Sequence, residues 1–176
     1  LAPPRCFRVV LGPQADYFSE RGIATFLASH YTVTPSSDRM GMRLDGPAIE
    51  HSRGYNIVSD GIAPGSIQVP GTGQPIVLLA DRQTTGGYPK IATVISADVP
   101  ALGRLKPGSK LAFEAVDLAQ ARAARIAQEA MLAAWRAAMR PVADEAYGAT
   151  LDRLMAQNLV SGVVDAWSGS AQYDEA

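Results

Sequence analysis

The chain has very few residues of the kinds that hold metals or form disulfides. Its 176 residues include one cysteine, Cys6, and two histidines, His30 and His51. One thiol cannot form an internal disulfide, and this set is too small for a zinc site of the Cys/His type, so no metal is expected. We predict that Cys6 is a small buried side chain on a strand and that both histidines lie at the surface. We place the protein in the reducing cytoplasm.

Neither charge nor hydrophobicity is extreme. The 16 Lys and Arg residues balance the 17 Asp and Glu residues, for a net charge of -1. This balance argues against nucleic acid or an anionic membrane as a partner. No apolar run is long enough to span a bilayer, and the start shows no signal-peptide pattern. The chain opens on Leu-Ala-Pro-Pro without a methionine, which is typical of an interdomain linker and leads us to expect a piece of a longer protein.

The pattern of apolar residues predicts a mainly β domain over residues 1–116. Gly and Pro separate short apolar runs at regular intervals, which favours a barrel or a sandwich. Apolar residues at helical spacing predict two short helical turns within residues 16–29, separated at Gly22. The predicted strands are residues 5–11, 31–34, 41–44, 67–69, 75–80, 91–95 and 110–116.

A helical extension is predicted over residues 117–160, where Ala, Leu, Gln and Arg predominate. Its first helix is amphipathic, begins at Asp117 as the capping residue, and ends before Pro141. A second helix is predicted at residues 142–159, followed by a flexible tail at 161–176. We expect these helices to pack against the barrel or against a sister subunit, which would allow a homo-oligomer.

The first polar segment of interest carries Asp38 and Arg39 side by side. Neighbouring residues in an extended chain point to opposite faces. Arg39 can therefore make a bidentate contact with a carboxylate or phosphate while Asp38 caps the loop. An ordinary surface ion pair in a turn explains the same residues equally well.

The second polar segment reads Thr-Thr-Gly-Gly at residues 84–87, after a very apolar strand. Adjacent glycines let backbone N–H groups approach a ligand closely. Tyr88 and Pro89 stiffen the exit and deliver Lys90, which can stabilise a developing negative charge; the alternative is an ordinary solvated lysine. The chain contains no Gly-x-Ser-x-Gly elbow and no phosphate-binding P-loop motif.

Several segments together resemble the C-terminal half of the biotin-dependent carboxyltransferase-like family. They read Ser-Asp-Arg-Met-Gly-Met-Arg-Leu at 37–44, Ser-Asp-Gly at 59–61, Gly-Ser-Ile-Gln-Val-Pro at 65–70, and Gln-Thr-Thr-Gly-Gly-Tyr-Pro-Lys-Ile at 83–91. The family includes the carboxyltransferase domain of urea carboxylase, allophanate hydrolase subunit 2, KipA and the C subunit of 5-oxoprolinase. The resemblance covers residues 5–116 and implies a cyclophilin-like β-barrel.

The resemblance also implies a heteromeric enzyme with a KipI-like or allophanate hydrolase subunit 1-like partner, inactive as this piece alone. Arg39 would hold the substrate carboxylate, and Lys90 would stabilise charge at the amide. We expect these two cations to reach the rim of one hollow, with Asp38 as a further catalytic residue. The implied substrate-binding residues are Asp60, Gln68, Gln83, Thr84, Thr85, Gly86, Gly87 and Tyr88.

Three functions follow from this resemblance. The leading one is ATP-dependent hydrolysis of a small amide or lactam, above all 5-oxoproline. The second is biotin-dependent carboxyl transfer to urea, with carboxybiotin supplied by another chain. The third is a KipA-like regulatory module that binds an inhibitor of a sensor kinase. In none of them is a cofactor expected to bind to this chain itself; ATP would be used by the complex.

Overall fold

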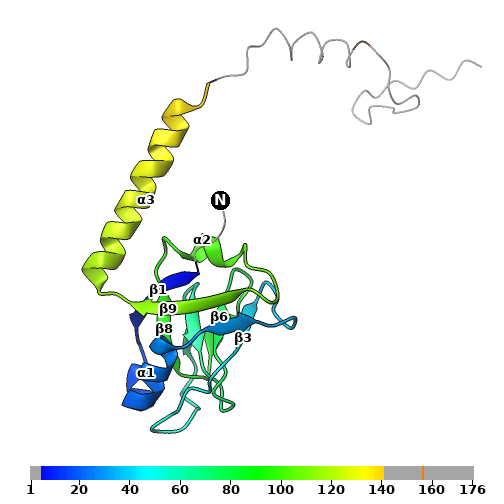
Figure 1. Cartoon of the computed structure of the whole chain (residues 1–176), viewed down its shortest axis with the longest axis vertical. Coiled ribbons are helices and arrows are strands. Elements are labelled where there is room, and N and C mark those ends of the chain that lie inside the picture. The colour runs from blue at the N-terminus through cyan, green and yellow to red at the C-terminus, as the bar shows by residue number, and fades with distance from the viewer. Residues whose placement is uncertain (1–4, 141–155, 157–176) are drawn as a thin grey trace, which may run out of the picture. The chain divides into compact units, whose positions relative to one another are not determined.

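A closed barrel of seven strands forms the body of the protein (Figure 1). The computed structural model describes residues 5–140 and 156. The barrel strands, each within two residues of its predicted bounds, are β1 (Cys6–Leu11), β2 (Tyr31–Val33), β3 (Gly41–Asp45), β5 (Ser66–Gln68), β6 (Ile76–Leu78), β8 (Lys90–Val94) and β9 (Lys110–Ala115). The predicted mainly β fold is confirmed, and the choice between barrel and sandwich is settled as a barrel.

The strands follow the order β1-β8-β5-β6-β3-β2-β9, and the barrel closes where β9 returns to β1. That closing pair is parallel, with Cys6 opposite Ala112 and Val9 opposite Ala115. All the other pairs in the barrel are antiparallel. Closure leaves no unpaired sheet edge around this ring of strands.

The core follows from the two-residue alternation of side chains along the strands. Phe7 and Val9 of β1 are fully buried, and helix α1 (Glu20–Ala28) closes one side with Phe26. The ring of Phe26 stacks on Phe113 of β9, with centroids 4.8 Å apart. Cys6 is exposed, so the prediction of a buried thiol is wrong. The residue precedes Phe7, and the same alternation that buries Phe7 turns Cys6 outward.

The segment before β2 forms two short helical pieces, as predicted. They are η1 (Ala15–Tyr17) and α1, whose first turn is capped by Ser19 Oγ accepting from Gly22 N at 3.0 Å. The break therefore lies before Ser19, and the prediction of a break at Gly22 is wrong. Gly22 is required inside the helix because a Cβ there would collide with the backbone carbonyl of Glu50.

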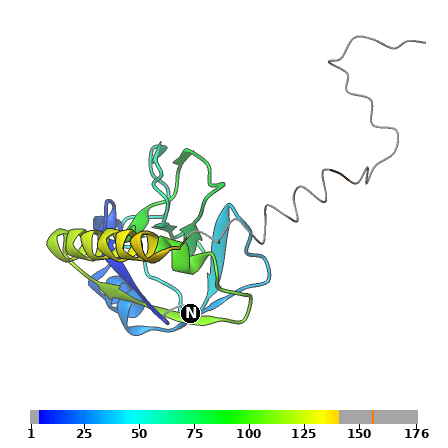
Figure 2. The ribbon, with the colours of Figure 1, turned by 90° about the horizontal axis from the view of Figure 1, so that it is seen from above.

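Two very short strands, which the sequence did not predict, lie outside the barrel. They are β4 (Asp60–Gly61) and β7 (Thr85–Gly86), and they pair antiparallel as a separate ribbon. Figure 2 shows the teal chain near residue 60 and the green chain near residue 85 projecting together from the barrel. A further short helix, α2 (Val99–Leu102), leads toward β9.

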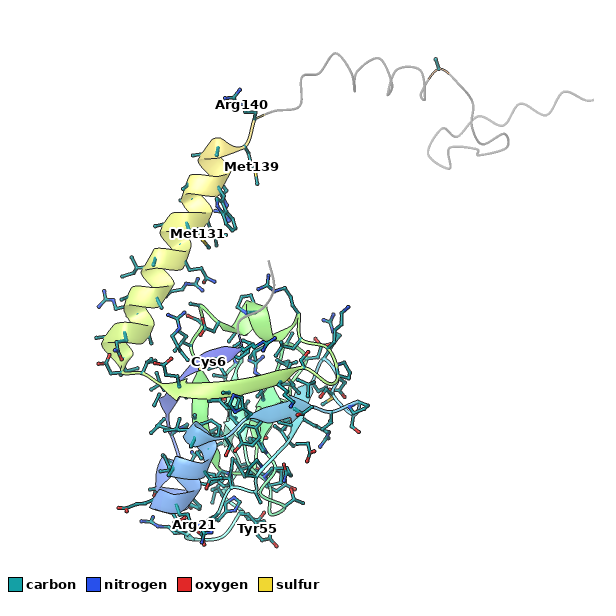
Figure 3. All side chains as sticks on the ribbon, in the orientation of Figure 1. Cys6, Arg21, Tyr55, Met131, Met139 and Arg140 are labelled. Atoms are coloured by element: carbon teal, nitrogen blue, oxygen red, sulfur yellow. The ribbon has the colours of Figure 1, made fainter. Side chains whose placement is uncertain are left out.

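Helix α3 (Leu118–Ala138) follows the barrel and begins as predicted at Asp117. Asp117 Oδ1 accepts from Gln120 N at 2.7 Å, and Gln120 Oε1 accepts from Asp117 N at 2.9 Å. This reciprocal pair is a capping box. No residue of α3 is buried, and Ile126 is exposed, as is Met131 (labelled in Figure 3).

The second helix predicted at residues 142–159 and the tail predicted at 161–176 fall outside the described residues, apart from residue 156. No helix among the described residues has both the length and the apolar character needed to cross a membrane.

Candidate functional site

A polar cleft of about 720 Å³ opens between β3, β5, β6 and the loop that carries Gln83 and Tyr88. Four residues predicted for the site line it: Asp38, Gln68, Gln83 and Tyr88. They come from segments that are far apart in the sequence and that the barrel brings to one place. The volume lies within the range that proteins use for small-molecule ligands.

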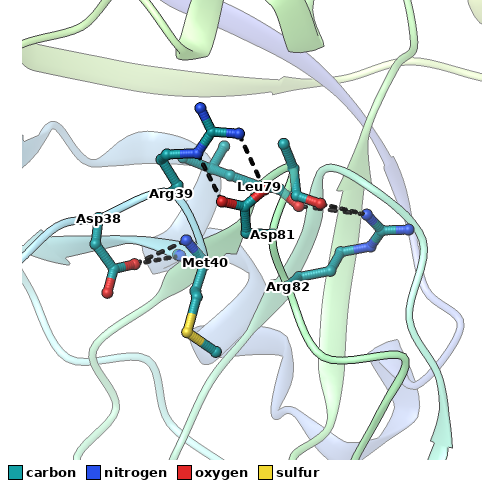
Figure 4. A network of polar contacts seen from close by, with 8 residues as sticks. Asp38, Arg39, Met40, Leu79, Asp81 and Arg82 are labelled. Carbon is teal, nitrogen blue, oxygen red and sulfur yellow. Dashed lines mark hydrogen bonds and ion pairs between the residues drawn. The ribbon is translucent and has the colours of Figure 1, made fainter. Parts of the chain in front are cut away.

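Asp38 and Arg39 take different roles (Figure 4), and of the two only Asp38 lines this cleft. Asp38 Oδ1 accepts from the backbone N–H groups of Met40 and Gly41, at 2.8 and 2.9 Å, so the predicted loop cap is confirmed. Arg39 is strongly exposed, with its Nε 2.6 Å from Asp81 Oδ2 and its Nη2 3.1 Å from Oδ1. Its hydrogen bond lowers the pKa of the Asp81 carboxyl. The bidentate carboxylate partner of Arg39 is therefore a residue of the chain itself.

Lys90 is buried, with 1% of its surface exposed. Its Nζ donates to Asp60 Oδ2 at 2.7 Å and to the Gly61 carbonyl at 3.0 Å. Asp60 also accepts from Gln14 Nε2 at 3.0 Å and from Gly61 N at 2.8 Å. The hydrogen bond from Lys90, followed by those from Gln14 and Gly61, lowers the pKa of Asp60.

The expectation that Arg39 and Lys90 share the rim of one hollow is wrong. Each cation is held by a carboxylate of its own, and Lys90 lies beneath the β4–β7 ribbon. The physical reason is the register of β8, which starts at Lys90 and turns its side chain toward Asp60, away from solvent.

The tract at residues 84–87 is paired with the chain opposite it. Thr84 O accepts from Ile62 N at 3.0 Å, and Gly87 O accepts from Ile57 N at 2.8 Å. A Cβ at Gly86 would lie 2.6 Å from Gln68 Nε2 and 2.7 Å from Ile62 Cδ1, so a larger residue would displace both side chains. Packing of the ribbon on the barrel therefore accounts for Gly86, while Thr84 and Thr85 are exposed.

Arg43 is a residue of the cleft that sequence reasoning missed. It lies on β3 between the buried residues Met42 and Leu44, and its exposed side chain lines the cleft. The two-residue period of the predicted strand at 41–44 was the signal that could have found it, because this period directs Arg43 to the face opposite the core.

Within residues 5–140 and 156, no group of three or more His, Cys, Asp or Glu side chains is placed to hold an ion. His51 packs on Phe18, with ring centroids 4.8 Å apart, and its Nε2 lies 3.0 Å from the Val69 carbonyl oxygen. It is half-buried, in contrast to the predicted surface position.

The closed barrel and its polar cleft define a β-barrel domain with a site of small-molecule size. Residues 2–115 match the family described as carboxyltransferase domain, subdomain A and B. The chain belongs to this family, which confirms the resemblance read from its motifs.

Named relatives support this assignment. The chain is 43% identical to the 5-oxoprolinase C subunit of Haemophilus influenzae over 122 residues, which cover 68% of this chain and 40% of the relative. It is 38% identical to the 5-oxoprolinase C subunit of Escherichia coli over 131 residues, covering 73% of this chain and 42% of the relative. The crystal structure of Kluyveromyces lactis urea carboxylase matches with a TM-score of 0.67 and 27% identity, over 70% of this chain and 12% of that one. The chain thus spans about two fifths of the length of the bacterial relatives.

Proposed function

We propose that this chain is the barrel part of a subunit of a heteromeric enzyme that opens 5-oxoproline with the use of ATP. The observation that carries the proposal is its 43% and 38% identity to two 5-oxoprolinase C subunits. The family match at residues 2–115 covers the barrel and the cleft, so the likeness bears on the site as well as on the fold.

The chemistry of the cleft is compatible with a small cyclic amide. Gln68 and Gln83 offer amide groups that can both donate and accept hydrogen bonds, and Asp38 offers a carboxylate. Tyr88 supplies an exposed ring and a hydroxyl at the mouth. We assign substrate contact to these four residues.

The remaining predicted site residues act by positioning in this proposal. Lys90 and Asp60 tie the ribbon to the barrel, and the pairing of residues 84–87 sets the path of the loop that presents Gln83 and Tyr88. Arg39 joins the loop of Asp38 to the segment after β6 through Asp81.

The rest of the reaction is assigned to other chains. ATP would be bound by a KipI-like or allophanate hydrolase subunit 1-like partner, in the cytoplasm. The described part of this chain offers the cleft for the substrate, and we assign no nucleotide or other cofactor to it.

The test is reconstitution of the full-length protein with its partner subunits. We expect glutamate to form from 5-oxoproline only when ATP and all the subunits are present. Gln83→Ala should lower the rate strongly, because Gln83 lines the cleft. Arg104→Gln, an exposed substitution outside the cleft, should leave the rate unchanged. Absence of glutamate from the complete wild-type complex would contradict the proposal.

The structural match to urea carboxylase favours one alternative, biotin-dependent carboxyl transfer to urea. In that case the same complex would form allophanate from urea when a carboxylated biotin carrier protein is supplied. Production of allophanate without turnover of 5-oxoproline would decide for the alternative.

A further inference from the structure

Arg43 is the one cation among the described residues that line the cleft. Among the residues that the structure describes, no carboxylate lies within ion-pair distance of the Arg43 guanidinium. Arg39 and Lys90, the cations that the motifs suggested, are paired with Asp81 and Asp60. Arg43 is therefore the cation of this cleft that is available to an anionic ligand.

The backbone of Arg43 is held firmly in place. Its N–H donates to Ser37 Oγ at 3.0 Å, and the Ser37 hydroxyl donates to the Arg43 carbonyl at 3.2 Å. The same carbonyl accepts from Thr34 N at 2.9 Å. A side chain that projects from a fixed backbone loses less freedom when it binds a ligand.

Gln68 supplies a second, buried polar group in the same cleft. Only 2% of its surface is exposed, and its Nε2 donates to the Tyr88 carbonyl at 3.3 Å. Within the described part of the chain, its Oε1 receives no hydrogen bond. Since this oxygen is not among the buried polar atoms that lack a partner, it keeps contact with the cleft and can accept an N–H from a ligand.

The charges of the cleft limit what can bind. Arg43 shares the lining with two carboxylates, Asp38 and Asp45. This combination disfavours polyphosphates and other multiply charged anions. It suits a ligand with one carboxylate and a nearby N–H donor.

We propose that Arg43 binds the carboxylate of the substrate and that Gln68 Oε1 accepts the N–H of its ring amide. The inference rests on the proposed function, because 5-oxoproline carries both groups on one small ring. It assigns to Arg43 the role that the sequence motifs suggested for Arg39.

The test compares 5-oxoproline with 2-pyrrolidinone, the same lactam ring without the carboxylate, by calorimetric titration of the full-length protein in complex with its partners. The wild type should bind 5-oxoproline about ten- to a hundredfold more tightly, the usual worth of a charge-assisted contact. Arg43→Gln should bring this ratio close to one, and the matched surface variant Arg104→Gln should leave it unchanged. Gln68→Met should weaken both ligands alike.

Measuring glutamate formation in the same preparations separates the two proposals. If Arg43→Gln loses the preference for 5-oxoproline over 2-pyrrolidinone but the wild type forms no glutamate, the carboxylate subsite stands and the 5-oxoprolinase proposal is removed. If the wild type forms glutamate but Arg43→Gln keeps the preference for 5-oxoproline, the subsite alone is overturned. The same holds if Arg39→Gln, and not Arg43→Gln, abolishes that preference. A wild type that binds neither lactam overturns both.

Discussion

The ion pair between buried Lys90 and half-exposed Asp60 leads to a prediction about what lysine contributes at position 90. The side chain is 1% exposed, so its four methylene groups fill core volume in addition to carrying the charge. Truncation by Lys90→Ala removes that volume and should cost roughly 2–4 kcal/mol, the range for large-to-small changes in a core. Lys90→Met keeps most of the volume and removes the charge. Because the remaining partner, Asp60, is half-exposed, this change leaves no buried unpaired charge, so we expect a loss of less than about 1 kcal/mol.

Asp60 responds differently because it is half-exposed, with 51% of its side chain accessible. In Lys90→Met its carboxylate keeps the hydrogen bonds from Gln14 and Gly61 and gains water. In Asp60→Asn, by contrast, the ammonium of Lys90 stays buried without a counter-ion. We therefore expect Asp60→Asn to be less stable than Lys90→Met, and Lys90→Met to rescue it in the double variant.

Urea unfolding of the full chain at pH 7, with the slope m checked for constancy, measures all four variants. The pH dependence provides a second test. The pKa of Asp60 is lowered in the folded state. Its contribution to the free energy of unfolding is therefore complete above the pKa of the unfolded state and is lost as the pH falls through the pKa of the folded state. Below about pH 4 the advantage of the wild type over Asp60→Asn should therefore shrink. The reasoning is refuted if Lys90→Met loses as much stability as Lys90→Ala.

Three further predictions concern the helices. Gly22→Ala should lower the free energy of unfolding by about 1–3 kcal/mol, because the added Cβ would overpack against the Glu50 carbonyl. The same substitution normally stabilises a helix, so a raised melting temperature would contradict this prediction. Asp117→Ala should lower the stability of α3 by about 1 kcal/mol and reduce its helical circular dichroism signal, because the hydrogen bond from Gln120 N is lost. Asp117→Asn, which keeps an oxygen acceptor, should retain the stability and the signal. If the C-terminal helices mediate a homo-oligomer, Ile126→Glu should lower the mass measured by sedimentation; an unchanged oligomer would exclude this face of α3 as the interface.

The sequence by itself determined those features that depend on residues close together in the chain. Short apolar runs bounded by Gly and Pro located β1 and β9, and the composition change after the barrel located α3. The cap at Asp117 involves a residue three positions away, and the cap at Asp38 involves residues two and three positions away. Turn chemistry and side-chain period act over such short distances, so they can be read without knowledge of the fold.

The tertiary structure alone decided which charged groups of the barrel and ribbon meet. Asp60 is 30 positions from Lys90, and Arg39 is 42 positions from Asp81. Their pairing depends on the order of strands around the barrel and on the ribbon of β4 and β7, whose two-residue strands carry too little pattern to be predicted. Burial of Lys90 and the exposure of Arg43 in the cleft follow from that order. The sequence motifs contained four of the residues that line the cleft, and the closure of the barrel selected the side chains that face it.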